Sequence, residues 1–134
     1  MAKEFIKWQK SFSVGVDEID EQHKHFIKIL NKVHNKLDEE NKDLKDEIDE
    51  LVEYARIHFS TEERYFDEWK YPFEDEHKIV HAKLTLDVLK FKQRFDNGER
   101  IADELTEFLK EWLGVHLKVY DGKYAKYIKE NHLI

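Results

Sequence analysis

Cysteine is absent from this sequence, and proline and glycine are scarce, with one and four residues. The absence of cysteine excludes disulfides, thiolate zinc sites and thiol nucleophiles, so nitrogen and oxygen atoms must hold any bound metal. Charged residues make up 40% of the chain, against about 25% in an average domain. Many charges with few turn-forming residues favour long solvated helices and exclude a turn-rich β-sandwich.

The chain also lacks a long apolar run and an excess of positive charge. No run approaches the roughly 20 residues of a membrane span, and the first ten residues lack the apolar region of a signal peptide. The 23 Lys and Arg residues are outnumbered by 30 Asp and Glu residues, which gives a net charge of −7. We therefore expect a cytoplasmic protein that binds neither nucleic acid nor membrane.

Apolar residues recur at steps of three and four in four segments, which is typical of helices with one buried face. The pattern predicts helices over residues 18–38, 43–70, 73–95 and 100–120. Asp17 is the expected N-cap of the first helix, and Asn97 and Gly98 are the expected stop of the third. We expect an extended N-terminal arm over residues 1–16, a connection at 38–42 and a short aromatic tail after residue 120.

These predictions describe one domain over residues 1–134, since this length suits a single hydrophobic core. Connections as short as those between the predicted helices make each helix run antiparallel to the one before it. The predicted fold class is all-α, an up-down-up-down four-helix bundle.

Each predicted helix carries histidine or carboxylate on the face that should be apolar. A single buried histidine is more often a hydrogen-bonded structural residue than a metal ligand, but four facing helices contribute here. Two of the helices carry a pair of such residues four positions apart, the spacing with which a helix presents two ligands to one metal. Buried imidazoles and carboxylates are costly unless they are paired or bind a metal. The antiparallel bundle brings to one end the side chains of His23, His58, Glu62, His77, His81 and His116.

Asp121 is a further candidate ligand with two open interpretations. It follows His116 by five residues, which is about 140° around an ideal α-helix and would point it away from the site. A local π-turn would bring it back; otherwise Asp121 is a surface residue beside Gly122. We expect the other three histidines to lie outside the site. His34 is predicted at the edge of the core, and His25 and His132 are predicted in solvent.

Five imidazoles and two carboxylates are too many ligands for one tetrahedral zinc ion and too rich in nitrogen for calcium or magnesium. Two first-row transition ions fit the set better. If Glu62, Asp121 and one solvent-derived oxygen bridge two octahedral ions, three histidines complete one ion and two leave the other five-coordinate. One open coordination position on a redox-active pair of metal ions suits a small diatomic ligand.

Four ordered blocks of this sequence resemble the hemerythrins, particularly the single-domain bacterial ones. The blocks are GVDEIDEQHK at 15–24, HFSTEE at 58–63, EHKIVH at 76–81 and WLGVHLKVYD at 112–121. The resemblance covers residues 8–127, nearly the whole chain. Leu117, where isoleucine is common, and the bulky Tyr120 depart from the family pattern without removing a ligand.

The resemblance implies a non-haem site with two iron ions, bridged by Glu62, Asp121 and an oxo or hydroxo group. It also implies that one iron has three histidine ligands (His77, His81 and His116) and the other has two (His23 and His58). In this family dioxygen binds reversibly at the five-coordinate iron, which is carriage for storage or delivery rather than an enzymatic reaction. The expected apolar oxygen pocket consists of Phe26, Phe59, Trp112, Leu113 and Leu117.

Two other functions remain alternatives at this stage. An oxygen or redox sensor would act through a partner protein. A di-iron oxidase of the ferritin-like class would use two Glu-x-x-His motifs, and this spacing occurs once, at residues 74–77. Iron storage is disfavoured because no second acidic layer is present. We expect a monomer, since no helix shows an apolar outer stripe.

Overall fold

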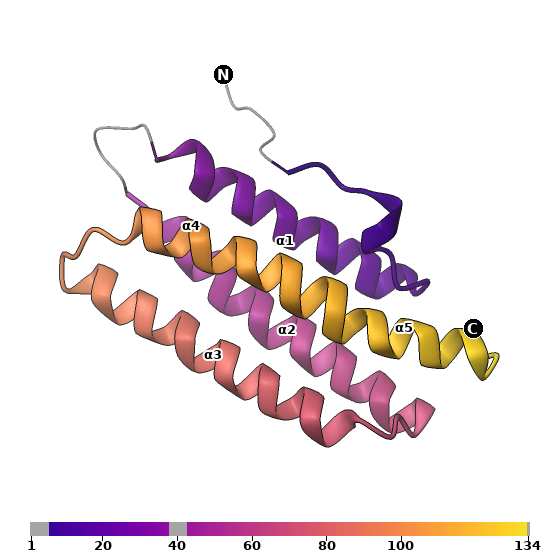
Figure 1. Cartoon of the computed structure of the whole chain (residues 1–134). Coiled ribbons are helices and arrows are strands. Elements are labelled where there is room, and N and C mark those ends of the chain that lie inside the picture. The colour runs from indigo at the N-terminus through magenta and orange to yellow at the C-terminus, as the bar shows by residue number, and fades with distance from the viewer. Residues whose placement is uncertain (1–5, 38–42, 134) are drawn as a thin grey trace.

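The computed structural model describes residues 6–37 and 43–133, and all regular structure within them is helical. Figure 1 shows long rods that run antiparallel to their neighbours, with the last three elements joined end to end. The prediction of an all-α, up-down-up-down bundle is confirmed. The elements are η1 (Lys10–Phe12), α1 (Asp17–Asn35), α2 (Lys45–Trp69), α3 (Glu74–Asp96), α4 (Ala102–Glu111), the π-helix η2 (Trp112–Tyr120) and α5 (Asp121–Glu130).

The first three long helices lie close to their predicted bounds. The first ends earlier than expected, at Asn35, and the predicted connection at 38–42 lies outside the described residues. The second and third helices differ from prediction by one or two residues at each end. Gly98 follows α3 with a φ of 86°, the left-handed conformation expected of a helix stop.

The prediction for the C-terminal region is wrong beyond residue 120. The expected aromatic tail is helical, and α5 continues the rod to Glu130. Gly122 lies inside this helix, where glycine costs about 1 kcal/mol relative to alanine. Tyr124 and Ile128 are both fully buried on the inner face of α5, and their burial outweighs that cost.

The N-terminal arm packs on the body through Phe12, Val14 and Val16, which are all buried, while residues 1–5 lie outside the described part of the chain. Asp17 does not cap α1, because it is the first helical residue and no side chain caps this end. The carboxylate of Asp20 holds the arm instead. It accepts hydrogen bonds from the Val14 backbone N–H at 2.8 Å and from the Ser13 hydroxyl.

Two apolar clusters form the core and flank a polar layer. The larger cluster includes Phe26, Leu51 and Leu105, and the smaller includes Ile19, Phe66 and Tyr124. In α1 the smaller cluster precedes His23 and the larger follows it, and in α2 the two clusters lie on opposite sides of the ligand pair in the reverse order. The ligand layer therefore lies between the two clusters. In the described residues, no helix combines the length and the apolar character needed to span a membrane.

Candidate metal centre

All seven predicted ligands meet in the polar layer, and none has more than 2% of its surface exposed. Five helical elements contribute to this group. They are α1 with His23, α2 with His58 and Glu62, α3 with His77 and His81, η2 with His116, and α5 with Asp121.

Asp121 reaches the site because the helix before it is a π-helix. The Asp121 backbone N–H donates to the carbonyl oxygen of His116, five residues earlier. This i to i+5 pattern brings residues five apart toward one face of the helix. Asp121 is fully buried, so its interpretation as a surface residue is wrong.

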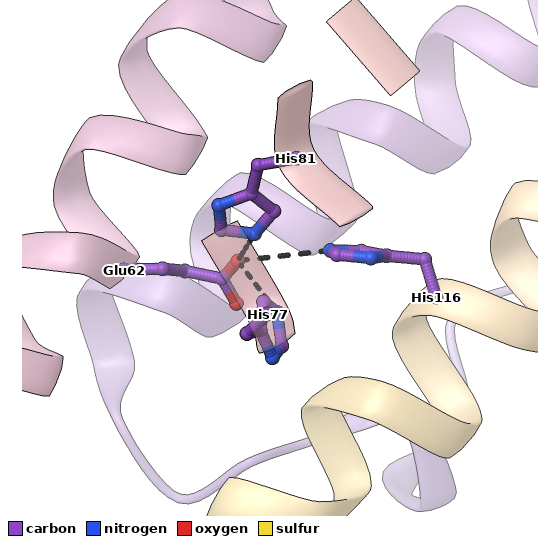
Figure 2. A group of neighbouring side chains, drawn as sticks. All are labelled: Glu62, His77, His81 and His116. Atoms are coloured by element: carbon purple, nitrogen blue, oxygen red, sulfur yellow. Dashed lines mark hydrogen bonds and ion pairs between the residues drawn. The ribbon is translucent and has the colours of Figure 1, made fainter. Parts of the chain in front are cut away.

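One group of side chains gathers three histidines around Glu62. Figure 2 shows the three imidazoles turned toward the Glu62 carboxylate. Oε1 of Glu62 lies 2.9 Å from Nε2 of His81, 3.6 Å from Nε2 of His77 and 3.7 Å from Nε2 of His116. These four side chains offer one oxygen and three nitrogen atoms, all within 4.8 Å of one another.

A second group shares Glu62 and adds the other two histidines and Asp121. Nε2 of His23 lies 2.9 Å from Oδ2 of Asp121, and Nε2 of His58 lies 3.4 Å from Oε1 of Glu62. The other oxygen of Asp121, Oδ1, lies 3.1 Å from His77 and 3.3 Å from His116. Asp121 therefore presents one oxygen to each group, which is the disposition of a bridging carboxylate.

Hydrogen bonds behind the rings orient three of the histidines. Nδ1 of His58 lies 2.7 Å from Oε1 of Gln22, Nδ1 of His81 lies 3.0 Å from Oε2 of Glu63, and Nδ1 of His23 lies 3.4 Å from the Phe12 carbonyl. Because each partner atom is an acceptor, the Nδ1 atom carries the proton. The neutral ring then directs the lone pair of Nε2 into the site, as metal-bound histidines do.

The inward-facing atoms need a cation between them. Without a metal, Nε2 of His23 and of His81 must carry a proton to donate to the carboxylate oxygens that lie 2.9 Å away, and a metal ion takes the place of such protons when it is coordinated. Among residues 6–37 and 43–133, the buried atoms without a hydrogen-bond partner include Nε2 of His58, His77 and His116 and Oδ1 of Asp121. Unpartnered buried polar atoms are costly, so their convergence is the signature of ligands. The residues present fit a pair of transition-metal ions.

The pKa values in the layer reflect burial and mutual attraction. Burial favours neutral His58 and lowers its pKa to about 3. Burial also lowers the pKa of His77, but attraction to the nearby carboxylates of Asp121 and Glu62 outweighs burial and raises this pKa to about 9. Burial opposes ionisation of Glu62 and Asp121, yet the surrounding imidazoles hold both pKa values below their ordinary range. Two ionised carboxylates thus lie at the centre of the bundle at neutral pH.

Aromatic side chains cover one side of the layer. The Phe59 ring stacks on His81, with centroids 4.0 Å apart and an interplanar angle of 11°. Trp112 contacts both Phe59 and Phe26. Leu113 and Leu117 are buried in the same cluster, so all five predicted pocket residues belong to the core around the site.

A recess of about 300 Å³ reaches His116 and Trp112 from the surface between α3 and the rod formed by α4 and η2. Sequence reasoning did not identify most of its lining. The apolar residues missed are Ile79, Val80, Leu84, Phe108 and Val115.

Sequence reasoning also missed three side chains that contact the predicted ligands. Gln22 and Glu63 each adjoin a ligand in the chain, and that adjacency was the available signal for them. Tyr124 lies in the predicted aromatic tail, but its hydroxyl donates to Oε2 of Glu62 at 2.6 Å. No local pattern marks Tyr124, because this contact spans 62 positions.

The remaining histidines do not join the centre. His132 is exposed, as expected, and His34 is half-buried at the edge of the core. His25 is exposed but not simply solvated, because its Nε2 atom lies 2.6 Å from Oε1 of Glu50.

Comparisons with known proteins agree with this architecture. The sequence model of the Hemerythrin HHE cation binding domain matches residues 14–128. The chain is 37% identical over 125 residues to a bacteriohemerythrin of Stenotrophomonas maltophilia, covering 92% of this chain and 82% of that protein. It is 31% identical over 119 residues to a hemerythrin-like protein of Naegleria gruberi, covering 89% of this chain and 90% of the other.

The fold is similar to that of solved hemerythrin structures. The crystal structure of a wild-type hemerythrin superposes with a TM-score of 0.83 at 26% sequence identity, covering 91% of this chain and 96% of that one. The family match spans most of the chain and includes all seven residues of the buried centre. The chain belongs to the hemerythrin family.

Proposed function

We propose that this protein binds dioxygen reversibly at a non-haem pair of iron ions, for oxygen storage or delivery. The observation that carries the proposal is the unequal division of five buried histidines into two groups that share Glu62, with one oxygen of Asp121 facing each group. The three-histidine group of His77, His81 and His116 would hold one iron and His23 with His58 would hold the other. Glu62 and Asp121 would bind both irons. When bound, the iron pair supplies the two electrons that dioxygen binding requires.

The protein side chains prepare this site in two ways. Gln22, Glu63 and the Phe12 carbonyl hold three imidazoles with Nε2 directed inward, so the ligands need little reorganisation when metal binds. Phe26, Phe59 and Trp112 exclude water from one side of the layer. A dry apolar wall without proton donors slows the loss of bound oxygen in reduced form, which favours carriage over turnover.

An oxygen sensor that acts through a partner is the alternative that a specific observation favours. Contrary to the expectation of no apolar outer stripe, α3 and η2 expose large apolar side chains. Ile79 is 71% exposed and Val119 is 58% exposed, and both lie on elements that carry iron ligands. A partner that binds this surface only in one oxygenation state would favour sensing, which pull-down with and without oxygen tests.

A visible absorption spectrum, recorded on protein whose iron content has been measured, tests the proposed function directly. The protein is reduced without oxygen, exposed to air and then purged. Two irons per chain and a charge-transfer band that appears in air and fades on purging are expected. A band that never reverses would contradict reversible carriage and favour the sensor or an oxidase.

Matched variants connect the spectrum to the predicted ligands. His77→Ala removes a ligand from the three-histidine group, and we expect it to abolish the oxygen-dependent band. His25→Ala is the control, because His25 is an exposed histidine on α1 outside the centre. An unchanged spectrum in His77→Ala would contradict the assignment of this site.

A further inference from the structure

A row of aromatic side chains leads from the buried carboxylate Glu62 to the surface. The hydroxyl of Tyr124 donates to Oε2 of Glu62, and the Tyr124 ring lies 5.7 Å from the Trp69 ring between centroids. Trp69 in turn stacks on Tyr65, with centroids 5.0 Å apart and an interplanar angle of 25°. Tyr124 is fully buried, Trp69 is buried and Tyr65 is half-buried, so the row runs from the centre of the bundle to solvent.

Both tyrosines in this row have a carboxylate that can take the phenolic proton. Neutral tyrosine loses an electron readily only when its hydroxyl proton moves to an acceptor at the same time. Tyr124 donates to Glu62, and the hydroxyl of Tyr65 donates to Oε1 of Glu18 at 2.9 Å. The Arg64 guanidinium lies over the Tyr65 ring at 5.1 Å and favours a neutral ring over a cationic one.

Other oxidisable side chains near the site lack this arrangement. Tyr54 stacks on His58 at 5.2 Å, but among the described residues its buried hydroxyl has no hydrogen-bond partner. The same holds for the hydroxyl of Tyr71 and for Nε1 of Trp112. A proton acceptor at each tyrosine therefore distinguishes the row of Tyr124, Trp69 and Tyr65.

The near-absence of sulfur from this chain makes its tyrosine and tryptophan residues the important candidates for oxidation. Sulfur side chains are usually the first to take up oxidising equivalents, but this chain has no cysteine and a single methionine, at position 1. Tyrosine and tryptophan are the next most easily oxidised side chains. An iron pair that reacts with peroxide would therefore draw any electron it lacks from an aromatic residue or damage its own histidines.

We propose that Tyr124, Trp69 and Tyr65 form an electron path from the protein surface to the metal centre. The path operates when hydrogen peroxide is reduced at a centre that has no electrons left to give, and it rests on the proposed di-iron function. Reduction of one peroxide to two waters consumes two electrons and two protons.

Each electron moves inward through Trp69 and Tyr124, and each leaves a neutral tyrosyl radical at Tyr65 after the phenolic proton passes to Glu18. A small one-electron donor of the ascorbate class restores Tyr65 by giving back one electron and one proton. Two such donors balance one peroxide. The path thus places the oxidising equivalent where a soluble reductant can reach it.

The test adds hydrogen peroxide to the iron-loaded protein in the presence of a spin trap. Iron content and the oxygen-dependent spectrum are measured first on the same samples. Peptide mass spectrometry then locates the trapped radical, and freeze-quench electron paramagnetic resonance identifies its type. The expected result is a tyrosyl signal with the adduct at Tyr65 and none when the metal-free protein is treated in the same way.

Two substitutions at one position separate conduction from packing. Trp69→Phe keeps an aromatic ring that cannot readily be oxidised, and we expect it to lose most of the Tyr65 adduct and to oxidise residues around the centre instead. Trp69→Tyr restores an oxidisable ring and should restore the adduct. Tyr127→Phe is the control, because the Tyr127 hydroxyl donates to the backbone carbonyls of Trp69 and Lys70 and its ring lies against Tyr71, outside the row.

Four outcomes would overturn the path. An equal adduct at Tyr65 in Trp69→Phe, or an adduct in the metal-free protein, would show that Tyr65 is oxidised directly. A normal oxygen-dependent spectrum without any radical at Tyr65 would refute the path and leave the proposed function intact. Failure of the protein to hold iron would refute both.

Discussion

Gln22 accepts a hydrogen bond from the imidazole of His58 at 2.7 Å, and this contact joins α1 to a predicted ligand on α2. The Gln22 amide is itself oriented, because its Nε2 donates to the hydroxyl of Thr61 at 3.0 Å. The Thr61 hydroxyl donates onward to the Ile57 carbonyl at 2.9 Å. The direction of each bond in this series leaves Oε1 of Gln22 as the acceptor for His58.

Removing this acceptor should weaken metal binding. In Gln22→Leu nothing holds the proton on Nδ1 of His58, and we expect the affinity for metal to fall about 10- to 100-fold. Titration of the metal-free protein with Fe(II) under anaerobic conditions measures the change. Glu21→Ala alters the neighbouring exposed residue and should leave the affinity unchanged. An equal loss in both variants would contradict a specific role for Gln22.

Tyr124 should contribute to stability through its bond to Glu62. Tyr124→Phe leaves Oε2 of the buried carboxylate without its 2.6 Å donor, and the free energy of unfolding of the metal-free protein should fall by about 1–3 kcal/mol. Urea denaturation followed by circular dichroism measures this. Tyr120→Phe is the control, because Tyr120 is half-buried and, in the part of the chain that the structure describes, its hydroxyl donates to neither Glu62 nor Asp121. A loss in Tyr124→Phe no larger than the control would contradict the prediction.

The metal-free protein should lose stability on both sides of neutral pH. The pKa of His77 is raised to about 9, so its stabilising contribution is complete below the unfolded value of about 6.5 and is lost as the pH rises through about 9. The pKa of His58 is lowered to about 3, so the folded state loses stability as the pH falls below about 6.5. Thermal unfolding across this range in a chelating buffer should show the maximum near neutrality.

Asp121→Asn tests the cause of the alkaline loss. The substitution keeps the side-chain shape but removes the charge that lies 3.1 Å from His77 and 2.9 Å from His23. The decline in melting temperature between about pH 6.5 and 9 should therefore be shallower than in the unaltered protein. An unchanged decline would show that another group causes it.

Phe59 should be a major contributor to the core beside the site. Phe59→Ala removes a buried ring that stacks on His81 and contacts Trp112, and we expect a loss of about 3–5 kcal/mol in the free energy of unfolding. Phe73→Ala removes a ring that is 47% exposed and should cost far less. Denaturant titration of both variants measures the difference, and similar losses would contradict the packing assigned to Phe59.

Much of the candidate site could be predicted because its signals are local. His58 with Glu62, and His77 with His81, lie four residues apart, and helical geometry alone places each pair on one face. The short connections between helices that each have one apolar face then predict an antiparallel bundle. In such a bundle the ligand pairs of different helices lie at the same end. Both inferences depend on the regular α-helix, which the first three long helices follow.

The predictions were less complete where the last helix departs from that regularity. A regular helix directs Asp121 away from the site, and only the π-helical segment η2 resolves the two interpretations. The predicted helix end at residue 120 is wrong, because the burial of Tyr124 and Ile128 stabilises a helix that continues through Gly122. Local propensity amounts to about 1 kcal/mol at such a position, and tertiary packing exceeds it.

The sequence by itself determined the bundle, six of the seven buried candidate ligands and the exclusion of sulfur from the site, because these follow from residue type and helical period. Only the tertiary structure decided which carboxylate oxygen faces which imidazole and which groups hold each ring from behind. It also decided that Tyr124 contacts Glu62 and that a recess reaches His116. These features depend on how far each helix is shifted and rotated against its neighbours, and the close packing of the whole core sets those displacements.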